Sequence, residues 1–210
     1  MNNAIAAPWG AATDQVEGGG STPTLSLHTV SPEWRAASIV RPAERLQLEP
    51  MIQAHYLRSW PAVCVLRLGL FVHGEVVGCV VFALPPRETA KRYGGVTWEL
   101  ARLWVADSVP RNGESFLLGQ AVRYIHKHHP DIQTLVSYAD PSVGHKGTVY
   151  RAANWTPDGR TDEGRKTPRA DYVCVATGKK YSRRKHVPAG TVVVRKARTA
   201  KPRFIWNFKR

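Results

Sequence analysis

Residues 137–155 read SYADPSVGHKGTVYRAANW. The stretch leaves a β-branched, strand-like run and ends on Trp155, and between these points it holds the acid Asp140, the imidazole of His145 and the phenol of Tyr150. A turn or a helix cap would account for any one of these side chains, but capping does not require all of them together. Ligands commonly bind at strand ends in α/β sheets. The stretch therefore predicts one wall of a binding pocket.

The flanking sequence predicts an α/β domain with a mixed sheet flanked by helices. Two β-branched runs around VHGE predict a hairpin whose turn is at Gly74. Apolar residues at helical spacing predict a long helix after the loop VPRNGESF. Neither glycine fingerprint of a Rossmann unit or a P-loop occurs. The expected order is a hairpin (62–84), a strand (96–106), a helix (113–129), a strand (132–140), a helix (142–154) and a strand (170–176).

The loop VPRNGESF allows two interpretations. Unpaired backbone N–H groups at a helix start favour anions, especially beside a glycine, and a cation adds a charged contact. The same residues also make an ordinary helix start, with Asn112 or Ser115 as the cap. Spacing alone does not separate the two. On the first interpretation, the residues that hold an anionic ligand are Arg111, Asn112, Gly113 and Ser115.

The chain has 210 residues, which suits one domain with tails. We expect a flexible leader at 1–25, a catalytic domain at 26–178 and a basic extension at 179–210. The start of the chain has no signal-peptide pattern, and no run is long enough to cross a bilayer, so we expect no membrane partner. Its three cysteines are far apart in apolar runs, which favours reduced core residues.

Positive charge is concentrated at the C-terminus. The net charge is +14, and residues 179–210 hold twelve Lys or Arg and no acid. β-Branched and aromatic residues alternate with these cations, which favours a nucleic acid over a purely solvating surface. We expect duplex DNA as the partner. The predicted phosphate contacts are Arg183, Arg184, Lys185, Arg195, Lys196, Arg198 and Arg203.

Two motifs resemble the GNAT acyltransferase fold. RNGES opens a helix after a strand, and VYRAANW resembles the tyrosine motif of a later GNAT helix, at Tyr150 and Trp155. The resemblance implies that the loop through Arg111 and Gly113 binds the pyrophosphate of acetyl-CoA or a related donor. The second glycine of the usual GNAT signature is replaced here by Ser115.

A narrower resemblance covers roughly residues 30–210. AHYLRSWP, WELARLWVAD, PRNGESFLLGQAVRYI, the 137–155 stretch and the basic ending are together similar to the Mom family of phage DNA-modification proteins. This resemblance implies conversion of adenine in duplex DNA to N6-carbamoylmethyladenine, which protects phage DNA from restriction in the host bacterial cytoplasm. The functional positions it implies are His55, Tyr56, Arg102, Ser115, Asp140 and Tyr150.

The resemblance also suggests iron, with His55, Tyr56 and Asp140 as candidate ligands. An acid and a base alone cannot make an unactivated methyl carbon electrophilic, so a redox metal or a rearranged donor would remove this difficulty. We expect the target adenine to flip out of the duplex and to stack on Tyr138, Trp104 or Tyr150. Two alternatives remain, an ordinary GNAT N-acetyltransferase that uses acetyl-CoA and a DNA-binding protein without catalysis.

Overall fold

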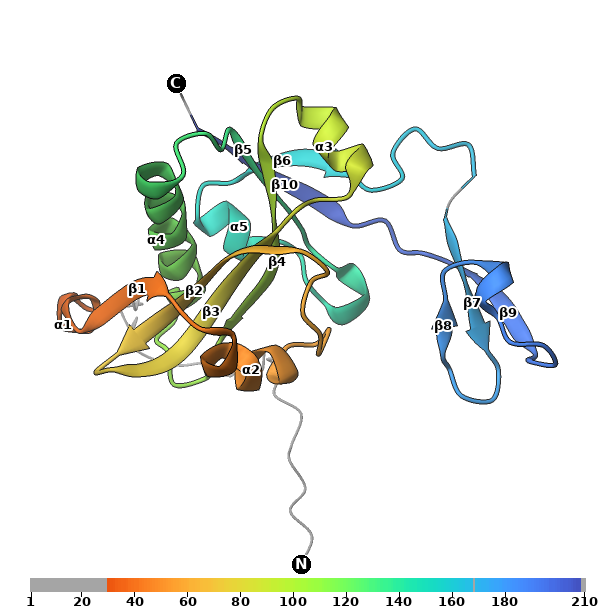
Figure 1. Ribbon diagram of the computed structural model, residues 1–210, viewed down its shortest axis with the longest axis horizontal. Helices are drawn as coiled ribbons and strands as arrows, with labels where there is room; N and C mark the ends of the chain where they lie inside the picture. Colours follow the sequence, from red (N-terminus) through yellow and green to blue (C-terminus); the bar gives the residue numbers. More distant parts are fainter. Residues whose placement is uncertain (1–29, 168, 209–210) are drawn as a thin grey trace, which may run out of the picture.

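The computed structural model describes residues 30–167 and 169–208. Its main body is a seven-stranded mixed sheet with the order β1-β2-β3-β4-β5-β10-β6 (Figure 1). The expected hairpin is confirmed as β2 and β3, with His73 and Gly74 at positive φ in its turn. The strands are β1 (Ser38–Pro42), β2 (Cys64–Val72), β3 (Glu75–Ala83), β4 (Thr97–Val105), β5 (Thr134–Tyr138), β6 (Thr156–Arg160) and β10 (Pro202–Asn207).

Helices cover both faces of this sheet. The larger apolar core lies between one face and the helices α4 and α5, and it includes Leu117, Phe82 and Phe204. A smaller core lies on the other face, where Leu48 and Ile52 of α2 pack on the sheet. No helix within the described residues has the length and apolar character needed to span a bilayer. The helices are α1 (Pro32–Ala36), α2 (Arg45–Ala54), α3 (Arg87–Tyr93), α4 (Gly113–His128) and α5 (Thr148–Ala152).

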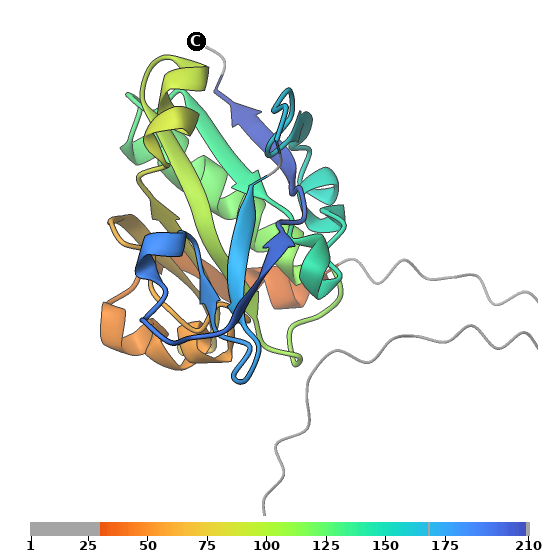
Figure 2. The ribbon, with the colours of Figure 1, turned by 90° about the vertical axis from the view of Figure 1, so that its right-hand side faces the viewer.

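A second, three-stranded sheet forms a small lobe, defined here as residues 169–198. Its order is β8-β7-β9, from β7 (Ala170–Cys174), β8 (Lys180–Tyr181) and β9 (Val193–Ala197). The lobe stands to one side of the main sheet in Figure 1 and lies in front of it in Figure 2, where that side faces the viewer. The strand expected at 170–176 therefore belongs to a sheet of its own. The boundary expected at residue 179 falls inside this sheet, between β7 and β8.

The C-terminal segment does not form one continuous extension. Residues 202–207 are β10, which is inserted between β5 and β6 and is antiparallel to both. Phe204 of this strand is 1% exposed and belongs to the larger core. The short apolar run Phe204–Trp206 suits this placement, because a strand inside a sheet has neighbours on both sides and little contact with solvent. The apolar residues of the C-terminal segment are thus core residues of the main body.

The helix expected at 142–154 is broken. A short 3-10 helix, Pro141–Val143, is followed by the turn that contains Gly144 and Gly147, and then by α5. Gly147 has a φ of +78°, and a Cβ at this position would lie 2.3 Å from the ring of Phe204. The close approach of β10 therefore requires a glycine here, and it also stops the helix from running through.

A bulge in β4 separates two residues that alternation places on one face. Leu100 is opposite Phe82 and Arg102 is opposite Val81, so Ala101 is an extra residue in β4. Leu100 consequently faces the larger core while Arg102 faces the side of α2. Strict alternation along the run VTWELARLWV would place Leu100 and Arg102 on one face, but a bulge changes the alternation of side chains beyond it.

The parallel pairing of β4 with β5 ends just before this bulge. It covers only Thr97–Glu99 and Thr134–Val136, although β4 continues to Val105. Beyond Glu99 the two strands are no longer paired. The sheet is therefore split at its centre, on the side of the strand ends where the sequence predicts a pocket.

Replacement of Phe204 by Ala tests whether β10 is a core strand. We expect it to lower the free energy of unfolding by about 3–5 kcal/mol, because it removes a fully buried aromatic ring. Chemical denaturation checks this. Val194→Ala in the small lobe, where the side chain is 53% exposed, is the control and should change the free energy by less than about 0.5 kcal/mol. Similar small effects of both variants would contradict the core assignment.

Candidate functional site

A cavity of about 580 Å³ occupies the split between β4 and β5. Residues from both faces of the sheet line it, because the strands have parted at this point. Arg102, Trp104 and Tyr138 line it on the α2 face, and Val149 and Tyr150 of α5 line it on the other. The cavity therefore passes through the sheet. Of the residues expected at the site, it is lined by His55, Tyr56, Arg102, Arg111, Asn112, Ser115 and Tyr150.

Arg102 lies at the α2 side of the cavity and is held by the backbone. Its Nε donates to the carbonyl oxygen of Ser59 at 2.8 Å, and its Nη1 donates to the carbonyl oxygen of Ala101 at 2.6 Å. The side chain is largely buried. These contacts fix one edge of the guanidinium, so that its charge has a defined position beside the cavity.

His55 and Tyr56 follow the end of α2 and lie against each other, with 4.4 Å between ring centroids. Burial, with Arg102 and His145 nearby, lowers the pKa of His55 to about 4. Burial and the charge of Asp140 raise the pKa of Tyr56 to about 12. Near neutral pH both rings are therefore uncharged.

Tyr150 lies on the opposite side of the split. Its hydroxyl is 2.9 Å from the Ser137 hydroxyl, which is in turn 3.1 Å from the carbonyl oxygen of Leu100. Burial raises the pKa of the Tyr150 phenol. The ring packs on Trp155 and Phe204 with centroid distances of 5.7 and 5.0 Å. Ser137 thus links the phenol to β4 at the point where backbone pairing has stopped.

Asp140 lies at the edge of the cavity and is not one of its lining residues. Its Oδ1 accepts hydrogen bonds from the backbone N–H and the hydroxyl of Ser142, at 3.0 and 2.6 Å. Its Oδ2 is 2.6 Å from the Nζ of Lys201. Burial alone would raise the pKa of Asp140, but these donors outweigh burial and lower it. Asp140 also caps the 3-10 helix.

The N-terminus of α4 reaches the cavity from the α5 side. Asn112, Ser115 and the exposed Arg111 line the cavity, and the Ser115 hydroxyl donates to the carbonyl oxygen of Asn112 at 2.9 Å. Gly113 does not line it. A Cβ at Gly113 would lie 2.1 Å from Cγ1 of Val109, so this glycine permits close packing of the loop rather than close approach of a ligand.

A second cavity of about 630 Å³ lies beside the first, between α4, α5 and the start of the described chain. The two cavities share Asn112, Ser115 and Ala152 as lining residues. Among the residues that the structure describes, Arg35 and Arg123 line the second cavity and no acid does. A long ligand with anionic groups can therefore extend from one cavity into the other past the start of α4.

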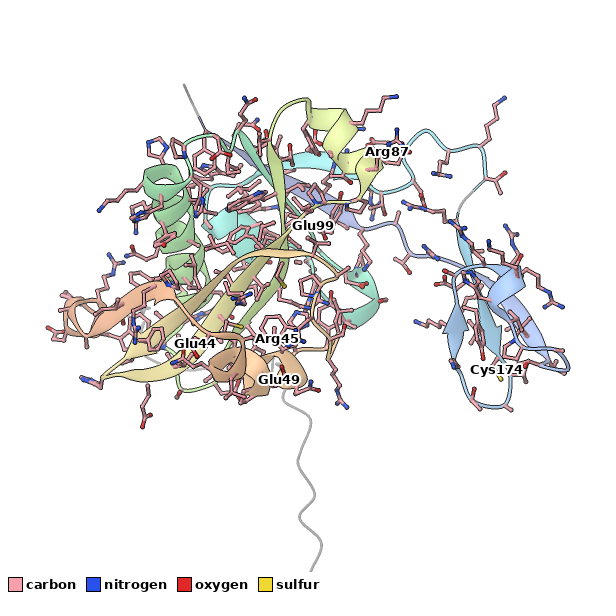
Figure 3. All side chains as sticks on the ribbon, viewed as in Figure 1. Glu44, Arg45, Glu49, Arg87, Glu99 and Cys174 are labelled. Atoms are coloured by element: carbon pink, nitrogen blue, oxygen red, sulfur yellow. The ribbon has the colours of Figure 1, made fainter. Side chains whose placement is uncertain are left out.

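Two charged residues near the site, Glu99 and Lys201, were not predicted from the sequence. Glu99 is the last residue of β4 that pairs with β5, and it lies near the centre of the main sheet (Figure 3). Burial raises the pKa of Glu99 to about 7, although Arg102 and Lys201 oppose the shift. An acid inside the apolar run VTWELARLWV was the available signal for Glu99. Lys201 gave no such signal, because it is one cation among many.

The small lobe holds most of the predicted DNA-binding residues. Residues 169–198 contain nine Lys or Arg and a single acid, Asp171, which pairs with Arg198 at 2.6 Å. Arg183, Arg184, Lys185, Arg195 and Lys196 are exposed.

The prediction for Arg203 is wrong. Arg203 is 6% exposed, and its Nε donates to Asp158 at 2.8 Å. It belongs to β10, directly opposite Tyr138, so its side chain is directed into the main body instead of toward a phosphate.

The three side chains suggested for iron do not form a ligand set in this arrangement. Nδ1 of His55 accepts the backbone N–H of Leu57 at 3.1 Å, and both oxygens of Asp140 accept hydrogen bonds from Ser142 and Lys201. Within the described residues, no group of three or more His, Cys, Asp or Glu is arranged to hold a metal ion. The donor chemistry at this position therefore does not fit iron.

Comparison with solved structures gives the fold. An aminoglycoside acetyltransferase bound to coenzyme A and kanamycin is 11% identical, with a TM-score of 0.50 over 81% of this chain and 94% of the other. A Bacillus subtilis acetyltransferase in complex with CoA is also 11% identical, with a TM-score of 0.49 over 82% and 98% of the two chains. The chain thus has the GNAT-like fold that its sequence predicted.

Comparison of sequences gives the family. The chain is 31% identical over 147 residues to the methylcarbamoylase Mom of Escherichia phage Mu, which is 67% of this chain and 56% of that protein. It therefore spans only about half the length of this relative. Residues 39–205 match the Mom protein family, a range that includes the first cavity, the lobe and most of β1 and β10. The chain belongs to the Mom protein family.

Proposed function

We propose that this protein is a transferase that converts adenine in duplex phage DNA to N6-carbamoylmethyladenine, acts in the host bacterial cytoplasm, and so protects the phage DNA from restriction. Family membership and the GNAT-like fold support a transferase. The observation that carries the proposal is the cavity through the split sheet. It has an anion-binding helix start on one face and a group of aromatic and charged side chains on the other, with a cationic lobe on the same chain.

The donor enters from the side of α4. Its anionic part binds the N–H groups at the start of α4 together with Arg111, as expected for a CoA-type donor. The second cavity, with Arg35 and Arg123, holds the rest of a long donor. The end that is transferred then lies in the split, near the hydroxyl of Tyr150.

Adenine enters from the α2 face. A flipped base can stack on an aromatic residue there, and Tyr138, Trp104 and Tyr56 all line this part of the cavity. Tyr150 lies on the donor side, so we assign it to the donor rather than to base stacking. Arg102 supplies a fixed positive charge beside the reacting groups.

The transfer forms a bond from adenine N6 to the methylene carbon of the carbamoylmethyl group. The bond from that carbon to the donor's leaving group breaks, and the leaving group takes the electron pair. N6 gives up a proton, which we assign to the ionised Asp140 at the edge of the cavity. Tyr150 donates a hydrogen bond to the charge that develops on the donor, and Ser115 helps to hold the donor.

DNA binds through the small lobe. Its cations have one acid among them, so its surface attracts phosphate without reading the sequence. This contact sets affinity and register, while the cavity selects the base.

Mass spectrometry of nucleosides tests the reaction. DNA from cells that express the protein should contain an adenosine that is heavier by one carbamoylmethyl group. Asp140→Ala and Tyr150→Phe should each lower its amount by about 10²- to 10⁴-fold, because each removes a proton-transfer or charge-stabilising group. Asp131→Ala and Tyr124→Phe, which change the same residue types outside the cavity, are the controls. DNA affinity should be the same in all four variants.

Other outcomes would contradict the proposal. Acetylated amines or proteins with unmodified DNA would indicate an ordinary N-acetyltransferase. Unmodified nucleosides with tight DNA binding would indicate a protein that only binds DNA. Equal loss of DNA binding and modification in Asp140→Ala and Tyr150→Phe would show that these residues are structural.

The salt dependence of DNA affinity tests the lobe. Arg183→Ala and Lys185→Ala should each weaken binding to all duplex sequences alike and reduce the slope of log K against log salt by about 1. Fluorescence anisotropy with a labelled duplex measures both effects. Lys127→Ala, an exposed cation at the far end of α4, should leave the slope unchanged. An equal change in all three variants would place the DNA elsewhere or show only a net-charge effect.

A further inference from the structure

Lys201 lies on the short segment that joins the small lobe to β10. Its backbone N–H donates to Oγ1 of Thr161 at 2.8 Å, and its carbonyl oxygen accepts the N–H of Thr161 at 2.9 Å. The next residue, Pro202, accepts the N–H of Ala139 at 3.0 Å. These bonds fix the backbone of Lys201 beside the end of β5, so its side chain is anchored close to Asp140.

The ion pair of Lys201 with Asp140 is partly buried. Nζ and Oδ2 are 2.6 Å apart, and the exposed fractions of the two side chains are 38% and 10%. The pair of Arg92 with Asp158 is longer, at 3.6 Å, and its fractions are 51% and 28%. Solvent screens the Lys201 pair less, so its effect on the carboxylate is larger than that of an ordinary surface pair.

Other charged and titratable groups face Asp140 from several elements. Tyr56 at the end of α2 and His145 in the turn before α5 both interact with its charge. On β4, Glu99 interacts with Lys201, and Arg102 interacts with Tyr56. Lys201 provides a hydrogen-bonded positive charge on the Asp140 carboxylate. Ser142 adds only neutral donors.

We propose that Lys201 is a positioning residue that keeps the Asp140 carboxylate ionised and oriented at the edge of the cavity. The assignment rests on the proposed function, in which Asp140 accepts the proton from N6. Without the ammonium group, burial would favour the protonated carboxyl, which cannot accept a proton. Lys201 follows Arg198, the last residue of the lobe, by three positions. The chain that leaves the proposed DNA-binding lobe therefore also supplies a residue of the proposed site.

A titration of Asp140 tests the electrostatic part without any reaction. Carboxyl NMR of the full chain should show that Lys201→Met raises the pKa of Asp140 by at least about one unit. The Asp140 signal is identified by its loss in Asp140→Asn. Lys201→Arg should retain the low value, and Lys127→Met should not change it. An unchanged pKa in Lys201→Met would overturn the proposal, whether or not the protein modifies DNA.

Stability gives a second readout of the same ion pair. The pKa of Asp140 is lower in the folded protein than in the unfolded chain, so its contribution to stability is complete above the unfolded value and is lost as pH falls through the folded value. The difference in unfolding free energy between wild type and Lys201→Met should therefore be largest near neutral pH and vanish in acid. A difference that is the same at every pH would contradict the role of Asp140 ionisation.

The pH profile of modification tests the positioning role. In Lys201→Met the acidic limb of kcat/KM should move to higher pH with the raised pKa of Asp140, and Lys201→Arg should restore it. At high pH the variant should recover much of its activity. If Lys201 served only to bind DNA, Lys201→Met would raise KM for DNA at every pH and leave the acidic limb in place. A wild-type protein that leaves DNA unmodified would contradict the proposed function, while the NMR result would still decide the effect of Lys201 on the Asp140 carboxylate.

Discussion

The site depends on one constraint, the early end of pairing between the two central strands. β4 and β5 share only three residue pairs, and the extra residue Ala101 prevents the ladder from continuing in register. Backbone groups that lose their strand partners must find others. The Ser137 hydroxyl lies within hydrogen-bond distance of both the carbonyl oxygen of Leu100 and the Tyr150 hydroxyl. One hydroxyl group thus links β5, β4 and α5 at the point where the strand pairing has ended.

Two carboxyl groups near this split have opposite electrostatic environments. Asp140 accepts three hydrogen bonds and its pKa is lowered, whereas burial raises the pKa of Glu99 to about 7. Lys201 interacts with both. Carboxyl groups whose environments separate their pKa values in this way are suited to different roles in one site. Near neutral pH, Asp140 is ionised, whereas Glu99 is present in both its protonated and its ionised form.

Much of this arrangement could be predicted from the sequence, for local reasons. The β2–β3 hairpin follows from alternation around His73 and Gly74, and α4 follows from its apolar spacing. The resemblance brought together His55, Tyr56, Arg102, Ser115 and Tyr150, all of which line the cavity. The missing parts depend on contacts between distant segments. Pairing of β10 with β5 removed Arg203 from the DNA-binding set, and a single bulge changed the face of Arg102. The many cations of the C-terminal segment obscured the short apolar run that forms β10.

The position of β10 has a consequence for how the protein is made. β6 pairs in the sheet only with β10, and β10 covers the edge of β5. During synthesis, one edge of β5 therefore stays unpaired until residues 202–207 have left the ribosome. Until then β6 has no strand to pair with. Unpaired strand edges tend to pair with other chains, so the nascent chain is prone to aggregation during this interval. A chain that terminates just after the lobe would carry its cations but lack both Lys201 and the strand that pairs with β5 and β6.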